Sequence, residues 1–152
     1  MAEAKIELKR GVNFTAAHLR GWESLEEFSF QLPGMKDRYP GKLFMKEPLG
    51  LTGVEMSLNR LPPGGEIPFL HRHRNNEELY IFIKGRGRFQ VDGEVLEVGE
   101  GSVIRVAQDG VRAWRNDSDE DLYFIVIQAR AGSMPDACIS DGVGVKGKAE
   151  WD

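Results

Sequence analysis

The stretch Gly65 to Gly85, GEIPFLHRHRNNEELYIFIKG, decides how the chain is interpreted. It holds His71 and His73, two of the three histidines, separated by a single residue. On an extended strand, residues i and i+2 face the same side, so the two imidazoles would face one point. Glu78 opens the apolar run that follows, and that run would place its carboxylate alongside on the next strand. The pattern predicts a metal site with nitrogen and oxygen ligands.

The segment that precedes this stretch, TGVEMSLNRL, alternates in polarity as a β-strand does. Its apolar residues share one face and its polar residues, Glu55, Ser57 and Asn59, share the other. If the polar face points outward, these residues form an ordinary solvent-facing surface. If it points inward, they form a polar wall, and Glu55 becomes a candidate catalytic group for proton transfer. The sequence leaves both alternatives open.

Short apolar segments continue to about residue 130 and are separated by glycine-rich turns. One of them, RGRFQVDGEVLEVGEG, has the Asp92-Gly93 signal of a tight hairpin. About eight strands at this spacing indicate an all-β sandwich or barrel. We expect a single domain over 1–152, with an N-terminal arm (1–49), a barrel (50–130) and a C-terminal tail (131–152) that Trp151 anchors.

The spacing of the central stretch resembles the first motif of the cupin superfamily, G-x5-H-x-H-x(3,4)-E-x6-G. Gly65, His71, His73, Glu78 and Gly85 fit that motif without a gap. The resemblance implies a cupin-type β-barrel, or double-stranded β-helix (jelly roll), with both terminal extensions packed outside it. It also implies that the two histidines and Glu78 bind a divalent transition metal (Fe, Mn, Ni or Zn) and that the protein is a homodimer.

The second cupin motif, G-x5-P-x-G-x2-H-x3-N, is altered in this chain. Gly99 and Asn116 bracket the matching region, and Arg112 stands where the motif has its metal-binding histidine. Arginine stays protonated and offers no lone pair, so it cannot act as that ligand.

Three interpretations of this change are open. In the first, two histidines and Glu78 form a facial triad suited to Fe(II), and Arg112 faces the open side and holds an anionic substrate. In the second, His18 supplies the missing nitrogen. In the third, the metal is lost and Arg112 pairs with Glu78.

Aromatic residues surround the expected ligands in the sequence. Four of them share strand parity with those ligands, and they either line a substrate-binding cavity or fill the barrel: Phe69, Tyr80, Phe82 and Trp114. Glu77 has the opposite parity to Glu78, so we expect it to face outward and to pair with an arginine.

Composition narrows the class of protein. The 152 residues carry a net charge of −4, which disfavours nucleic acid as a partner. A single cysteine, Cys138, excludes an internal disulfide bond, and no apolar run has the length of a membrane helix or of a signal peptide. We therefore expect a cytoplasmic protein.

Two function classes remain. One is a metalloenzyme of oxygenase or isomerase type that acts on a small polar or anionic metabolite. The other is a non-catalytic module, a sensor or carrier of a small ligand or a metal, which could be metal-free.

Overall fold

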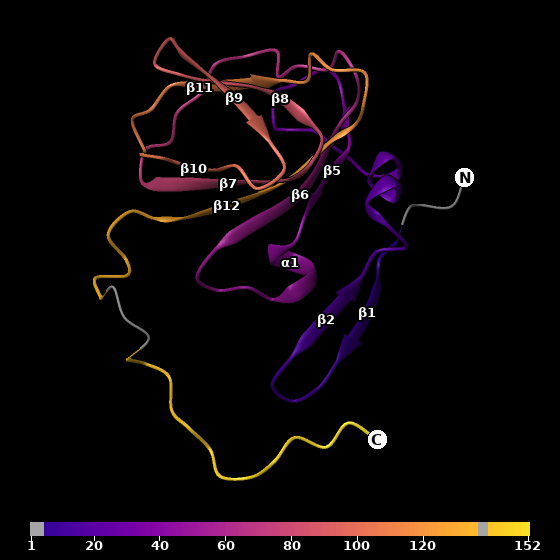
Figure 1. Cartoon of the computed structure of the whole chain (residues 1–152), viewed down its shortest axis with the longest axis vertical. Helices are drawn as coiled ribbons and strands as arrows, with labels where there is room; N and C mark the ends of the chain where they lie inside the picture. Colours follow the sequence, from indigo (N-terminus) through magenta and orange to yellow (C-terminus); the bar gives the residue numbers. More distant parts are fainter. Residues whose placement is uncertain (1–4, 137–139) are drawn as a thin grey trace.

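The computed structural model describes residues 5–136 and 140–152, and these residues form two facing β-sheets with short peripheral elements (Figure 1). The larger sheet has the strand order β10-β7-β12-β6-β5, and the smaller one β11-β8-β9. The strands of the larger sheet are β5 (Lys42–Phe44), β6 (Glu55–Leu61), β7 (Asn76–Lys84), β10 (Val103–Val106) and β12 (Leu122–Arg130). Those of the smaller sheet are β8 (Arg86–Val91), β9 (Glu94–Gly99) and β11 (Arg112–Arg115). The expected all-β barrel is confirmed.

The hairpin between β8 and β9 turns where the sequence predicts it. Asp92 and Gly93 both have positive φ, 50° and 86°, as a two-residue hairpin turn of the primed type requires. The turn sets the register that pairs Val91 with Glu94. Phe89 of β8 is therefore directed into the core, where it is fully buried.

Strand β6 directs its polar residues into the barrel, which settles one alternative that the sequence left open. Ser57 and Asn59 are only 3% and 4% exposed, and both line the interior cavity. The apolar residues Met56 and Leu58 face the opposite side and pack against the N-terminal arm. The barrel wall is thus covered on its outer side by apolar contacts from the arm.

Part of the arm packs apolar side chains against this outer face, and the whole arm consists of short elements. They are β1 (Glu7–Arg10), β2 (Thr15–His18), the 3-10 helix η1 (Trp22–Glu27), β3 (Ser29–Phe30), β4 (Tyr39–Pro40) and the short helix α1 (Lys46–Leu49). Leu25 of η1 is fully buried in the cluster that contains Leu58 and Tyr123. β5 belongs to the barrel sheet, so the barrel begins before residue 50, the boundary expected from the sequence.

The histidine segment is extended but is not a regular strand. It makes two isolated bridges, Glu66 with Arg115 and His71 with Arg112. Pro68, between the two bridges, has no N–H to donate, which interrupts the ladder.

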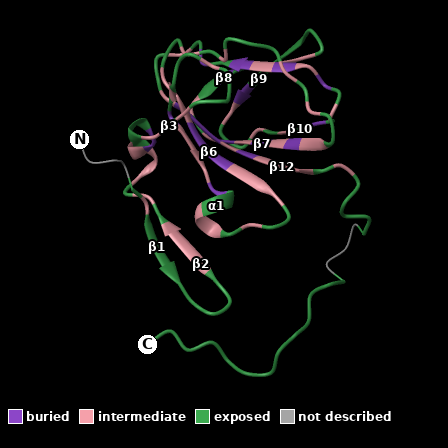
Figure 2. Ribbon diagram, turned by 180° about the vertical axis from the view of Figure 1, so that it is seen from behind, coloured by how far each residue is buried: buried purple, intermediate pink, exposed green. Residues whose placement is uncertain are grey.

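The C-terminal segment lies away from the barrel in Figures 1 and 2. Residues 132–136 and 140–152 are exposed, and Trp151 is 89% exposed. The expectation that Trp151 anchors the tail is therefore wrong. Cys138 lies outside the described residues. No helix in the described part of the chain has the length and apolar character needed to cross a membrane.

Candidate metal and ligand site

Backbone hydrogen bonds hold the histidine segment against β11 and the loop before it. His71 N–H donates to Arg112 O at 3.2 Å, and Arg112 N–H donates to His71 O at 3.0 Å. His73 N–H donates to Gln108 O at 3.0 Å. Because the segment is extended, the imidazoles of His71 and His73 lie on the same side, with ring centroids 5.5 Å apart.

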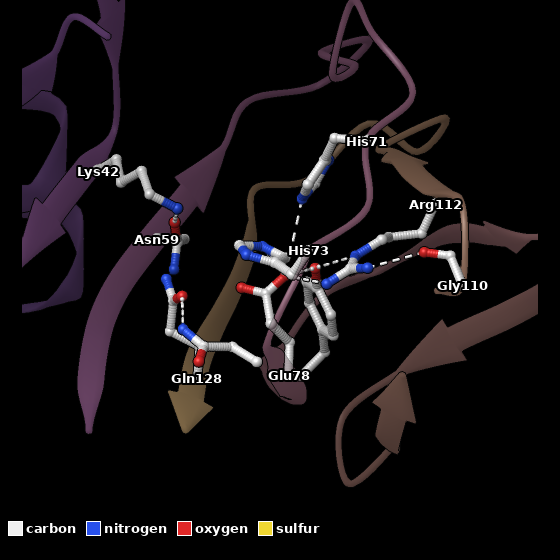
Figure 3. A network of polar contacts seen from close by, with 10 residues as sticks. Lys42, Asn59, His71, His73, Glu78, Gly110, Arg112 and Gln128 are labelled. Atoms are coloured by element: carbon white, nitrogen blue, oxygen red, sulfur yellow. Dashed lines mark hydrogen bonds and ion pairs between the residues drawn. The ribbon is translucent and has the colours of Figure 1, made fainter. Parts of the chain in front are cut away.

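Both imidazoles approach one carboxylate oxygen, as Figure 3 shows. The Nε2 atoms of His73 and His71 lie 3.0 Å and 3.6 Å from Glu78 Oε1. One possible ligand atom from each of the three residues lies within 4.8 Å of the others. The side chains expected from the sequence to form the metal site are therefore brought together.

Arg112 lies behind Glu78 and does not line the cavity. Its side chain is fully buried; Nη2 donates to Glu78 Oε1, and Nη1 donates to Gly110 O at 2.7 Å. Its Nε donates to the hydroxyl of Tyr80 at 3.2 Å, and that hydroxyl donates to Glu78 Oε1 at 2.8 Å. The expectation that Arg112 faces an open side and holds substrate therefore differs from the observed geometry, because Glu78, Tyr80 and Gly110 already engage all three of its nitrogens.

The contacts set the charges of the site. Burial raises the pKa of Glu78, but contact with His71 and hydrogen bonds from Tyr80 and Arg112 outweigh it and lower that pKa to about 2. Burial lowers the pKa of His73; Glu78 opposes this, while Arg112 and His71 add to it. Burial and the neighbouring Glu78 raise the pKa of Tyr80, so its hydroxyl stays protonated and acts as a donor. At neutral pH the site thus offers an ionised carboxylate and, at His73, a neutral imidazole.

These residues fit a divalent metal ion. Two imidazoles and one carboxylate form a donor set that suits Fe(II) and other first-row ions. Ligands at about 2.1 Å from an ion stand roughly 3–3.5 Å apart, close to the two separations from Glu78 Oε1. Arg112 and Tyr80 already occupy Oε1, but Oε2 accepts no hydrogen bond from any residue that the structure describes. The guanidinium of Arg112 opposes a cation here.

A cavity of about 430 Å³ extends from this group toward β5 and β6. Its wall is mainly aromatic and apolar, with Phe30, Tyr39, Phe44, Phe69, Trp114 and Phe124 among the lining residues. Phe69 and Trp114 thus lie at the cavity as expected. Phe82 does not line it, because its ring is buried in the barrel core against Phe89 and Phe124.

Glu55 lines the cavity, but one of its oxygens already has a structural role. Its Oε1 accepts the backbone N–H groups of Lys46 and Met56, both at 3.0 Å. His18 lies exposed at the end of β2 and is not part of the ligand group. Glu77 pairs with Arg105 at 2.7 Å, as expected for the outward face of β7.

The sequence did not identify Lys42 and Gln128 as residues of the site, or Asn59 as the hydrogen-bond partner of Lys42. All three line the cavity, and in Figure 3 they lie on one side of His73 and Glu78, with Arg112 on the other. Asn76 donates to Gln128 at 2.9 Å. The available signal was the alternation of Lys42, Leu43 and Phe44 after the Gly41 turn, which matches a short strand with Lys42 and Phe44 on one face.

Comparison with known proteins places the barrel in a family. The family model described as the cupin domain matches residues 57–128 of the sequence. The crystal structure of a cupin protein from Bacteroides fragilis is 36% identical, covers 78% of this chain and 98% of that chain, and superposes with a TM-score of 0.66. The chain belongs to the cupin superfamily.

Two curated relatives are more distant. A 5-nitrosalicylic acid 1,2-dioxygenase from a Bradyrhizobium species is 31% identical over 55% of this chain and 40% of the relative. An oxalate-binding protein from Thermotoga maritima is 28% identical over 45% of this chain and 55% of the relative. The chain therefore spans about half the length of the curated relatives that it matches.

Proposed function

We propose that this cupin binds one divalent transition metal ion through His71, His73 and Glu78 and a small, anionic molecule in the adjoining cavity. The observation that carries the proposal is the convergence of three ligand atoms within 4.8 Å of one another at the wall of a 430 Å³ cavity. Fe(II), Mn(II), Ni(II) and Zn(II) are the candidate ions, because imidazole and carboxylate together accept all four.

The chemistry we propose is of oxygenase or isomerase type. When bound, such an ion supplies Lewis acidity and, as Fe(II) with open positions, a site for oxygen. The chain's own residues would hold Glu78 in place, through Arg112 and Tyr80, and exclude water with the aromatic wall. Glu55 lines the same cavity and is the proposed proton-transfer group. The name of the dioxygenase relative supports this class.

A metal-free binding module is the second candidate, and the Arg112–Glu78 ion pair favours it. The guanidinium compensates the charge of the carboxylate that a metal would need, so the carboxylate is paired without an ion. The name of the oxalate-binding relative is in keeping with binding without turnover. In this version the cavity still takes a small ligand.

Metal content tests the first candidate against the second. Protein purified without chelator or affinity tag is assayed by elemental analysis, then titrated calorimetrically with Mn(II), Ni(II), Zn(II) and, without oxygen, Fe(II). We expect about one equivalent in the wild type and loss of at least about 100-fold in affinity in His71→Ala, since one of three ligands is removed.

His18→Ala is the matched control, because His18 is an exposed histidine outside the ligand group. It should bind metal as the wild type does. If the wild type contains less than about a tenth of an equivalent of any transition metal and takes up none on addition, only the metal-free module remains.

We also propose a homodimer. The β1–β2 hairpin presents exposed apolar side chains, with Phe14 54% and Leu8 37% exposed. Sedimentation equilibrium tests this directly, and a mass equal to one chain at micromolar concentration would contradict it.

A further inference from the structure

The cavity wall includes a cation, the ammonium group of Lys42, that the site described above does not use. Lys42 lies on β5 at the edge of the larger sheet, opposite Asn59 in the register, and it faces the interior. Its Nζ donates to Asn59 Oδ1 at 3.0 Å (Figure 3). The same atom lies 5.0 Å from the ring centre of Phe44 and 5.6 Å from that of Phe30, within the range of cation–π contacts.

No carboxylate forms an ion pair with Lys42 in the part of the chain that the structure describes. An ammonium group has three N–H donors, and Asn59 takes one of them. Burial lowers the pKa of Lys42 to about 8, although the charges of Glu78 and Glu55 act to raise it. The group is therefore still mostly protonated at neutral pH and lacks a counter-ion in contact.

The backbone fixes the position of this side chain. Gly41, just before it, has φ 86°, and a Cβ at that residue would lie 2.2 Å from Arg60 O. Gly41 O accepts Arg60 N–H at 2.7 Å, and Gly41 N–H donates to Phe28 O at 2.7 Å. The close approach that only glycine permits holds β5 against β6, so Lys42 is presented from a tightly bound edge strand.

We propose that Lys42 binds the carboxylate of a small organic acid whose apolar body lies against the aromatic wall of the cavity. This inference rests on the proposed function, because it specifies the ligand of the same cavity. Two N–H groups of Lys42 remain after the hydrogen bond to Asn59, and a carboxylate is the partner that their positive charge favours. The rings of Phe30 and Phe44 flank the ammonium group. The opposite end of the acid would face His71, His73 and Glu78.

The rest of the wall selects this class of ligand. A phosphate group binds best where several cations converge, but the guanidinium of Arg112 is engaged behind Glu78, and that of Arg60 pairs with Asp121 at 3.0 Å. One ammonium beside aromatic rings matches a single carboxylate on an apolar body. The cavity volume, about 430 Å³, accommodates a substituted benzoate-sized acid.

Three small compounds test the inference by ligand-observed NMR titration: benzoate, the isosteric neutral benzamide, and acetate, which lacks the apolar body. We expect the wild type to bind benzoate at least about tenfold more tightly than either of the others. Lys42→Met should abolish that preference and leave the affinity for benzamide within about twofold. Lys42→Arg, which keeps the charge, should retain it.

Lys84→Met is the matched control, because Lys84 is an exposed lysine on a barrel strand. Its preference for benzoate over benzamide should equal that of the wild type. Equal binding of benzoate and benzamide by the wild type, no benzoate binding, or an unchanged preference in Lys42→Met would overturn the inference.

The same variants separate this inference from the metal proposal. Lys42→Met should take up Zn(II) as the wild type does, because Lys42 is not one of the three proposed metal ligands. A wild type that takes up no metal but binds benzoate through Lys42 would refute the metal site alone. A wild type that takes up metal but shows no preference for carboxylate would refute the role of Lys42 alone.

Discussion

The guanidinium of Arg112 and the carboxylate of Glu78 form a buried ion pair between β11 and β7. The guanidinium contacts Glu78 Oε1, the same oxygen that the imidazoles of His71 and His73 approach. The side chains of Arg112 and Glu78 are 0% and 6% exposed. One carboxylate thus stands between a fixed positive charge on one side and two potential metal ligands on the other. A metal ion bound as proposed would compete with Arg112 for Glu78.

Removal of the Arg112 guanidinium should destabilise the protein, because Glu78 would stay buried without its positively charged partner. We expect Arg112→Met to lower the free energy of unfolding by about 3–5 kcal/mol, because it leaves an ionised carboxylate without its main partner. The double variant Arg112→Met, Glu78→Gln should recover at least about 2 kcal/mol of this loss. Urea denaturation of the metal-free protein measures both changes. Strictly additive losses would show that the two side chains are not coupled.

Replacement of Arg112 by histidine should strengthen metal binding. The change removes the charge that competes for Glu78 and places an imidazole where the second cupin motif has its histidine. We expect Arg112→His to bind Zn(II) and Ni(II) at least about tenfold more tightly than the wild type. Calorimetric titration at pH 7 measures the affinity, with His18→Ala as a variant that should not change it. Affinity equal to that of the wild type would mean that Arg112 does not compete with the ion.

The sequence predicted the fold and the converging ligands because both depend on local spacing. His71 and His73 are two residues apart in an extended segment, and the turn at Asp92-Gly93 sets a hairpin with little help from the rest of the chain. The inward polar face of β6 was left undecided, because alternation shows two faces but not which one meets the core. The arm, which packs on the outer face, determines the answer.

The features that the sequence did not predict depend on contacts between distant segments. The sequence offered the pairing of Arg112 with Glu78, 34 positions away, as only one of three alternatives, and the ion pair and two further hydrogen bonds that form there favour it over a position facing the cavity. Lys42 lies in a strand of three residues within the least patterned part of the chain, and an alternation this short does not predict a strand. It reaches the cavity only because β5 pairs with β6.

The buried charge of Lys42 should lower the free energy of unfolding of the wild type. Burial lowers its pKa from 10.5 to about 8, so between these values the unfolded chain binds more protons and the stability of the wild type should rise with pH. The full shift corresponds to roughly 3 kcal/mol. We expect Lys42→Met to gain about 1–2 kcal/mol at pH 7, since lost ring contacts offset part of the gain.

Thermal and urea denaturation at pH 7 and at pH 10 measure the effect. The difference between Lys42→Met and the wild type should narrow at the higher pH, and Lys84→Met should show no such narrowing. A Lys42→Met variant that is less stable than the wild type at pH 7 would contradict the prediction.

The affinity for benzoate should depend on pH through Lys42. The carboxylate needs the protonated ammonium, so affinity should be constant from pH 6.5 to about 7.5 and should fall as pH rises through about 8, approaching tenfold per pH unit. Other titratable groups also face the cavity: Tyr39, Glu55, Glu66, His71, His73 and Glu78. Lys42→Arg separates their effects, because its guanidinium stays charged and its affinity should remain flat up to pH 10. Ligand-observed NMR measures both profiles, with benzamide as the neutral reference. A decline of equal size in Lys42→Arg would assign the pH dependence to another group and remove Lys42 as the carboxylate anchor.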